Sequence, residues 1–385
     1  MDSPKTKVLV AAQWFPPAFK AGGPIRSVSN LIHALNGKFH SEIEFFVFAG
    51  AYDLGSDDEL TGIKTGVWND PTEQSPCRVI FQKRQDWSKK CWNTIFDEVK
   101  PDVLYLNSLF SLPFSLRPLK IARSRGVRIV LAPRGMLGEG ALKIKPLKKF
   151  VFLSLARTWG IFRDVVFHAS TPNEAEEVKT HVHNAEVIEA QNFPDPTIKL
   201  LPILEKKQNT LNLLCLGRVH PVKNLHFALR VLSGTDLSNS PVHVNIVGPD
   251  EDSDYLKSLL LFSNEHLGIT YSGPVNPSNL AAVFENTHFL LQPTSHENFG
   301  HSIVESWGYG RPVIISDKTP WRDLQSAGLG YDLPLNSEVW TKYFEEILQI
   351  PPDKLAEQSA NCRDKYDQLT FAIELLSANL SLFKK

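Results

Sequence analysis

The chain has 385 residues, which at about 150 residues per domain predicts two or three domains, each large enough to bury a core. Its 41 Lys and Arg residues balance 42 Asp and Glu residues, and 26 Pro and 22 Gly are an ordinary share, so disordered, collagen-like and histone-like chains are excluded. The cysteines lack Cys-x-x-Cys spacing, so neither a disulfide framework nor a cysteine zinc site is predicted (Cys77, Cys91, Cys215, Cys362).

The first residues are polar and lead into an apolar strand without the features of a secretion signal. The longest charge-free apolar stretches, such as 103–116, are too short and interrupted to span about 30 Å of hydrocarbon. We therefore expect a cytoplasmic protein that is at most peripheral at the inner face of a membrane.

Short β-branched runs alternate with helical patterns along the whole chain, which indicates an α/β fold with parallel sheets covered on both faces. The polar, proline-bearing stretch Gln191–Thr197, followed by Lys206–Thr210, is typical of a linker. We therefore expect two Rossmann-like domains on either side of about residue 195. The predicted strands are 7–12, 43–48, 103–106, 127–131, 165–169, 211–216, 242–247, 289–292 and 313–316.

A glycine pair follows the first predicted strand. Gly22 and Gly23 lack a Cβ, so the backbone there can approach a phosphate or a sugar closely, and Pro24 suits a first helical turn. A Gly-Gly pair is more often an ordinary turn, but its place after the first strand favours a binding loop.

Two polar residues follow later strands of the same series. Asn107 comes after 103–106 and can hydrogen-bond a sugar hydroxyl, and Arg134 comes after 127–131 and can bind donor or acceptor oxygens. A structural arginine paired with an acid is an equal alternative for Arg134.

The segment from Arg117 to Arg163 holds twelve Lys or Arg and a single acid, Glu139. Within it, residues 141–157 interleave cations with large apolar side chains, a pattern that suits anionic headgroups or a lipid-diphosphate acceptor. A core helix with a solvated basic face is the alternative, and no nucleic-acid module is present. Peripheral membrane contact would use Lys143, Lys145, Lys148 and Lys149.

The strand 211–216 ends in Gly217, with Arg218 and Lys223 five residues apart on the next loop. At the carboxyl edge of a parallel sheet, these cations can converge on a phosphate and stabilise a departing diphosphate. Alone, the pair would be read as a solvated loop. Asp252 and Asp254 match an Asp-x-Asp metal pattern, but they open a helix and are read as capping acids, so no metal is expected.

The strongest signal follows the strand 289–292, where a polar loop leads into a helix. Glu297 lies in the loop and Glu305 eight residues later, and the amides of Gly300, His301 and Ser302 begin the helix, where a diphosphate can bind. A carboxylate there can hold a ribose diol. The alternative makes Glu297 a helix-start acid and Glu305 a solvated residue.

These two segments resemble the C-terminal domain of family 4 glycosyltransferases with the GT-B fold. Glu297 and Glu305 match the spacing of the family signature, and Gly217, Arg218 and Lys223 match its donor-phosphate clamp. Residues 14–28 look like the first strand, glycine loop and helix of the family. Many relatives carry a histidine where this chain has Asn107.

The resemblance implies two Rossmann-like domains whose parallel sheets face each other across a cleft. Residues 1–195 with a final helix near 368–385 would bind the acceptor, and residues 196–367 the nucleotide sugar. Glu305 would hold the ribose, Arg218 and Lys223 the diphosphate, and Glu297 the donor sugar. Glu297, Arg218 and Lys223 are the candidate catalytic residues, and the other candidate donor ligands are Gly22, Gly23, Gly217, Gly248, Phe299, Gly300, His301, Ser302 and Glu305.

The expected function is hexosyl transfer from a nucleoside-diphosphate sugar to a hydroxyl of a glycan or lipid-linked acceptor. The family implies retention of configuration, no metal and no other cofactor, and a role in envelope or exopolysaccharide synthesis. A sugar-nucleotide epimerase or hydrolase and a non-catalytic nucleotide-sugar binding protein are the alternatives.

Overall fold

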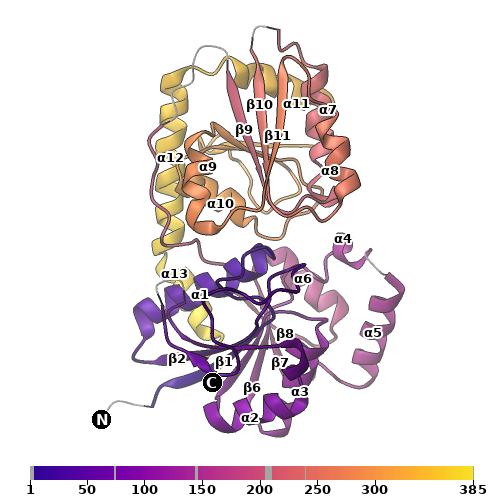
Figure 1. Ribbon diagram of the computed structural model, residues 1–385, viewed down its shortest axis with the longest axis vertical. Helices are drawn as coiled ribbons and strands as arrows, with labels where there is room; N and C mark the ends of the chain where they lie inside the picture. Colours follow the sequence, from indigo (N-terminus) through magenta and orange to yellow (C-terminus); the bar gives the residue numbers. More distant parts are fainter. Residues whose placement is uncertain (1–3, 73–74, 144–145, 204–209, 239, 385) are drawn as a thin grey trace. The chain divides into compact units, whose positions relative to one another are not determined.

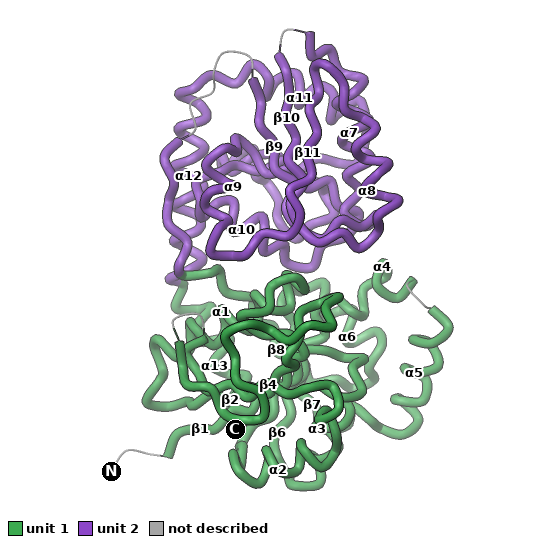
Figure 2. Tube along the Cα trace, in the orientation of Figure 1, with its two compact units in different colours: residues 1–196, 372–385 green, residues 197–371 purple. Residues whose placement is uncertain are grey.

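The computed structural model describes residues 4–72, 75–143, 146–203, 210–238 and 240–384, and these form two compact units (Figure 2). Unit 1 comprises residues 1–196 and 372–385, and unit 2 comprises residues 197–371. The sequence predicts a boundary near residue 195 and a return to the first domain near residue 368. Most of the second predicted linker stretch, 206–209, lies outside the described residues.

Unit 1 is built on an eight-stranded sheet of described residues in the order β3-β4-β2-β1-β5-β6-β7-β8 (Figure 1). Neighbouring strands are parallel except β3 and β4, which are antiparallel. The strands are β1 (Thr6–Ala12), β2 (Ile43–Gly50), β3 (Trp68–Asn69), β4 (Arg78–Gln82), β5 (Val103–Leu106), β6 (Arg128–Leu131), β7 (Val165–Ala169) and β8 (Glu186–Glu189).

Helices cover both faces of this sheet because successive side chains of each strand point to opposite sides. Val8 and Val10 pack with the apolar stripe of α1 and with the last residues of the chain, whereas Leu9 and Ala11 pack with α2 and α3. The helices of unit 1 are α1 (Gly23–Phe39), α2 (Lys89–Val99), α3 (Arg117–Ser124), α4 (Glu139–Leu142), α5 (Pro146–Thr158), α6 (Pro172–His181) and α13 (Ile373–Ser381).

Unit 2 has a six-stranded, all-parallel sheet of described residues in the order β11-β10-β9-β12-β13-β14. Its strands are β9 (Leu211–Leu216), β10 (Val242–Val247), β11 (Leu267–Gly273), β12 (Phe289–Gln292), β13 (Val313–Ser316) and β14 (Gly330–Leu333). Its helices are α7 (Leu225–Gly234), α8 (Ser253–Leu260), α9 (Leu280–Glu285), α10 (His301–Gly308), α11 (Ser337–Leu348) and α12 (Pro352–Phe371).

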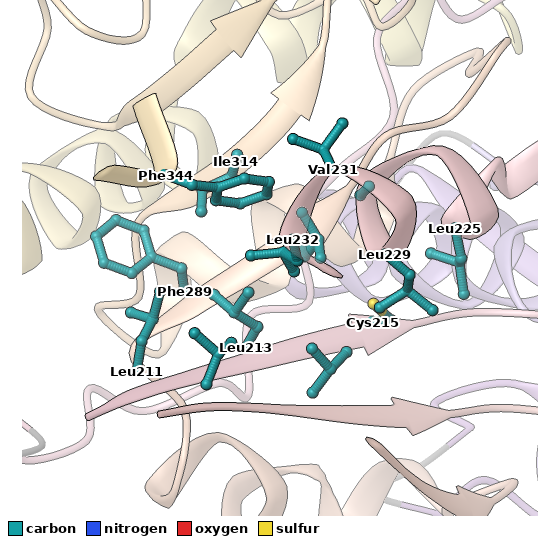
Figure 3. Close-up of a cluster of buried hydrophobic side chains, with 14 of the residues drawn as sticks. Leu211, Leu213, Cys215, Leu225, Leu229, Val231, Leu232, Phe289, Ile314 and Phe344 are labelled. Carbon is teal, nitrogen blue, oxygen red and sulfur yellow. The ribbon is translucent and has the colours of Figure 1, made fainter. Parts of the chain in front are cut away.

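The core of unit 2 is also divided by its sheet. Figure 3 shows one side, where Leu211, Leu213 and Cys215 of β9 pack against Leu229 of α7 and Phe344 of α11. On the other side, α9, α10 and α12 supply the apolar side chains. Helices therefore cover both faces of the sheet, and a polar ligand can reach it only at the ends of the strands.

The predicted α/β class with two parallel-sheet units is confirmed, and every strand predicted from the sequence is present. The sequence analysis missed β3, β4, β8, β11 and β14. All except β4 lie at a sheet edge, where a strand is covered less completely, as the exposed and half-buried residues of β8 and β11 show. Such strands do not produce the continuous apolar run by which a central parallel strand is recognised.

Candidate functional site

The strongest sequence signal falls where β12 ends and α10 begins, at the carboxyl edge of the sheet of unit 2. Gln292, the last residue of β12, is 3% exposed, and its Nε2 donates to Oε2 of Glu297 at 2.9 Å. Oε1 of Gln292 accepts from Oγ of Ser302 at 2.6 Å. A buried amide thus connects the loop carboxylate to the first turn of α10.

Lys223 reaches the same carboxylate from the loop that follows β9. Its Nζ donates to Oε2 of Glu297 at 2.7 Å, and the two side chains are 20% and 18% exposed. Lys223 ends a short 3-10 turn, and Asn224 then adopts a left-handed conformation at φ 52° before α7 begins. The structure therefore brings together two segments that the sequence analysis assigned separately to the donor.

Burial and the neighbouring Lys223 have opposite effects on the pKa of the Glu297 carboxyl. Burial by itself raises its pKa, but the charge and hydrogen bond of Lys223 oppose this, with smaller contributions from His301 and the Asn298 amide. The outcome is a pKa below the ordinary value, so Glu297 is ionised at neutral pH. The site holds a fixed negative charge beside a fixed positive one.

Arg218 pairs with a different acid. Its Nη1 donates to Oε1 and Oε2 of Glu251 at 3.0 and 2.9 Å, and its side chain is 47% exposed. Glu251 is placed there because Val219 exchanges backbone hydrogen bonds with Pro249 and Glu251. The two cations predicted to converge on a phosphate are thus each held by a separate carboxylate.

Gly248 is required by the close approach of two strand ends. It has φ 145°, and a Cβ on it would lie 1.9 Å from the carbonyl oxygen of Gly217. Gly217 has φ 143°, and a Cβ there would lie 3.5 Å from Cε of Lys223. Both glycines shape the floor beside Lys223, and their contact with a donor stays a prediction.

The amino end of α10 has the features of an anion site. Gly300 is its N-cap at φ 82°, and no side chain among the described residues caps this end. Phe299 is buried, and its carbonyl accepts from Nε1 of Trp321 at 2.6 Å, which fixes the loop. The Phe299 ring meets the His301 ring edge-on, with centroids 4.8 Å apart.

Glu305 lies in the second turn of α10 and is 6% exposed, between neighbours that are also buried. The alternative of a solvated helix residue is therefore wrong. A carboxylate seldom occupies so buried a position without a structural or binding reason.

In unit 1, the two predicted sugar contacts bind each other. Nε of Arg134 donates to Oδ1 of Asn107 at 2.8 Å, and Nδ2 of Asn107 donates to the Pro24 carbonyl at 2.9 Å. The other guanidinium nitrogens donate to Oδ1 of Asn192 and to the hydroxyl of Tyr105, both at 2.7 Å. Asn107, Asn192 and Tyr105 are neutral, so these hydrogen bonds of Arg134 differ from the alternative of a structural pairing with an acid.

A buried histidine completes this network. Nε2 of His168 lies 2.7 Å from the Ala190 carbonyl, which can only accept, so Nδ1 accepts from the Tyr105 hydroxyl, also at 2.7 Å. Burial, together with the Arg134 charge, lowers the pKa of His168 to about 3, and burial raises the pKa of Tyr105 to about 12. The Arg134 backbone has φ 57°, a strained value for a non-glycine residue.

The glycine pair begins α1, as the sequence indicated. Gly22 is the N-cap with φ 65°, and within the described residues a Cβ on it would meet no atom closer than 4 Å. Its need for glycine is therefore conformational, and the space beside it is open.

The Asp-x-Asp pattern is a helix cap. Oδ1 of Asp252 accepts from the Tyr255 amide at 2.9 Å at the start of α8, and Asp254 pairs with Lys257 at 3.3 Å. Within the part of the chain that the structure describes, no group of three or more His, Cys, Asp or Glu residues is placed to hold a metal ion. Over the same residues, no helix is both long and apolar enough to cross a bilayer.

Sequence analysis missed several partners of the site residues: Gln292, Glu251, Tyr105, His168 and Asn192. Most lie at or near the carboxyl end of a buried strand, and a polar residue at that position of an apolar run is the signal by which they could have been found. Glu251 could not be found in this way, because it lies in the loop after β10 and reaches Arg218 only through the packing of that loop against Val219.

The lysine–carboxylate pair and the amino end of α10 lie together at the carboxyl edge of an all-parallel sheet, which is where open α/β sheets commonly bind their ligands. Residues 198–364 match the family model of glycosyl transferases group 1. The matched residues lie within unit 2, which spans residues 197–371. The family 4 assignment is consistent with this match.

The chain is similar to D-inositol 3-phosphate glycosyltransferase of Gordonia bronchialis, with 28% identity over 46% of this chain and 41% of the relative. It is also similar to the O-antigen chain mannosyltransferase RfbU of Salmonella typhimurium, with 22% identity over 38% of this chain and 41% of the relative. The alignments therefore span well under half of these relatives.

Among solved structures, Anabaena HepE in complex with UDP and glucose is similar over 98% of both chains, with a TM-score of 0.70 and 14% identity. The likeness shows that the whole chain has the GT-B fold of two parallel-sheet domains.

Proposed function

We propose that this protein is a glycosyltransferase that moves a hexosyl group from a nucleoside-diphosphate sugar to an acceptor hydroxyl. The observation that carries the proposal is the Lys223–Glu297–Gln292–Ser302 chain at the amino end of α10, which ties a cation, a carboxylate and an anion-binding helix end together. The group 1 domain match and a solved relative that holds UDP and glucose support a nucleotide-sugar donor.

In this proposal, Lys223, Arg218 and the first amides of α10 bind the diphosphate, and Glu305 binds the ribose. Because Lys223 and Arg218 are paired with Glu297 and Glu251, donor binding exchanges part of these ion pairs for phosphate oxygens. That exchange releases the Glu297 carboxylate toward the sugar. Charge on the leaving diphosphate is then neutralised without a divalent ion, which EDTA treatment tests.

We further propose retention of anomeric configuration and a role in cell-envelope or exopolysaccharide synthesis. The O-antigen relative supports that setting. Unit 1, with Asn107 and Arg134, would bind a glycan or lipid-linked acceptor, and the protein would act at the cytoplasmic face of a membrane, with peripheral contact through Lys143, Lys148 and Lys149. Lys145, the remaining lysine of that prediction, lies outside the described residues.

The test begins with thermal stabilisation by UDP-, GDP- and ADP-sugars, because a ligand that binds only the folded state raises the melting temperature. With the stabilising donor, Glu297→Gln should lower kcat/KM of glycosyl transfer by about 10²-fold or more, the effect of losing one preorganised charge. Glu345→Gln, at an exposed position of α11 in the same unit, is the matched control and should transfer at the wild-type rate.

Two other functions predict different results. An epimerase or hydrolase would turn over the donor at full rate without an acceptor. A silent binding protein would be stabilised by the donor while neither the wild type nor Glu297→Gln released nucleoside diphosphate. Either result would contradict the proposal.

A further inference from the structure

Helix α5 of unit 1 turns large apolar side chains to the outside of the protein. Leu147 is 74% exposed and Phe150 69%, and Trp159, just after the helix, is 69% exposed. Val151 and Leu155 are also exposed. Other exposed apolar residues of the described chain lie singly or in pairs, so this cluster is the largest departure from an ordinary surface.

The opposite side of α5 is the side that packs on the protein. Ala156 is 2% exposed, and Phe152 and Leu153 pack with it against the core formed with α2 and α3. At 100° per residue, Leu147 lies opposite Ala156, with Val151 and Phe150 beside it. The helix is therefore apolar on two sides over its first turns, whereas the exposed Ser154 and Thr158 share the outer side farther along. This outer side has no covering partner among the described residues.

The charges around this outer side have one sign. Residues 140–163 contain no Asp or Glu, and Lys148 and Arg157 are exposed at either edge of the apolar face. Two further lysines of this segment have partners of their own: Lys143 forms an exposed ion pair with Glu139 at 2.6 Å, and Lys149 donates to the Ala141 carbonyl at 2.5 Å. The outer surface of α5 is thus an apolar strip with basic edges.

We propose that α5 and Trp159 dock in the interface of an anionic lipid membrane, with the apolar strip among the acyl chains and Lys148 and Arg157 on the headgroup phosphates. An apolar face flanked by cations is what such an interface binds, and tryptophan favours its polar boundary. A second copy of the chain fits poorly because two copies of this face would bring cations against cations.

This inference deepens the peripheral contact of the proposed function, since it names the apolar side chains of residues 141–157 that would enter the membrane. It makes the apolar strip the anchor and the cations the source of lipid preference. The inference rests on the proposed function for the identity of the acceptor. Vesicle binding does not require turnover, so the membrane proposal and the proposed function can be tested separately.

The experiment is flotation of the full chain with vesicles of phosphatidylcholine alone or mixed with phosphatidylglycerol. The wild type should float with the mixed vesicles and bind neutral ones more weakly, and added salt should reduce the difference. Leu147→Ser/Phe150→Ser should weaken binding to mixed vesicles roughly tenfold or more, since two large apolar groups no longer insert. Lys148→Gln/Arg157→Gln should lose the preference for phosphatidylglycerol.

Leu261→Ser/Phe371→Ser is the matched control, because these residues are 85% and 71% exposed on unit 2, and this variant should float as the wild type does. All replaced residues are exposed, and unchanged melting temperatures show that each variant folds. The proposal is overturned if the wild type ignores mixed vesicles or if the α5 variant binds them normally. It is also overturned if ultracentrifugation shows a dimer that only the α5 variant abolishes. Vesicle binding without stabilisation by any nucleotide sugar would instead count against the proposed function alone.

Discussion

At the residue scale, the site depends on how one carboxylate is kept ionised while largely covered by protein. Lys223 offsets the effect of burial on Glu297, and Gln292 donates to the same oxygen. Because the folded-state pKa lies below the ordinary value, this interaction stabilises the protein above the ordinary pKa. That stability is lost as the pH falls through the folded pKa.

Replacing the cation should move the pH dependence of turnover. In Lys223→Gln, burial still raises the pKa of Glu297 but the opposing charge is gone, so the acidic limb of the kcat/KM profile should shift to higher pH. The measurement is the pH–rate profile of both proteins, and the position of the limb is read separately from the overall fall in rate. Lys257→Gln, in an exposed pair on α8, should keep the wild-type limb. An unmoved limb in Lys223→Gln would show that Glu297 does not control turnover.

At the scale of elements, the floor of the site depends on how closely β9 and β10 end together. The backbone of Gly248 lies against the Gly217 carbonyl, and both residues have φ values that side chains rarely adopt. This packing places the loop of Lys223 and the loop of Glu251 side by side. The two glycines therefore position both loops in the structure without a bound ligand.

Gly248→Ala should therefore destabilise unit 2 by more than about 3 kcal/mol, through the clash with Gly217 together with the strained φ. The measurement is urea unfolding with and without a nucleotide sugar. The part of the transition that the nucleotide sugar shifts to higher urea concentration reports on unit 2. Gly234→Ala, at the end of α7, has no atom of the described residues within 4 Å of the added methyl group and should change stability by less than about 1 kcal/mol. Equal stability of the two variants would refute the packing explanation.

At the scale of the whole molecule, the chain returns to complete its first core. Residues 372–385 belong to unit 1, as the common colour in Figure 2 shows, although all of unit 2 intervenes in the sequence. Phe383 is 1% exposed, and its ring lies 5.6 Å from that of Phe45 and 5.8 Å from that of Tyr105, with Leu382 also buried. The last residues are thus part of the core behind the Arg134 network.

Phe383→Ala should destabilise unit 1 by about 3–5 kcal/mol, the usual cost of removing a buried phenylalanine ring. Hydrogen exchange read by mass spectrometry should show faster exchange in β1, β2 and β5, with protection in unit 2 unchanged. The matched variant Phe371→Ala removes a 71% exposed ring and should leave exchange as it is. Loss of protection in unit 2 alone would contradict the assignment of the last residues to unit 1.

The sequence by itself determined the class of fold, the central strands and the segments that form the candidate site. Buried parallel strands need long apolar runs, and the polar residues that follow them stand out against those runs. Local spacing also identified Glu297, Lys223 and the start of α10. It could not identify which acid pairs with Arg218, the neutral network around Arg134, or the burial of Glu305. Those features join residues that are distant in the chain, and only the packing of separate loops and strand ends decides which of them meet.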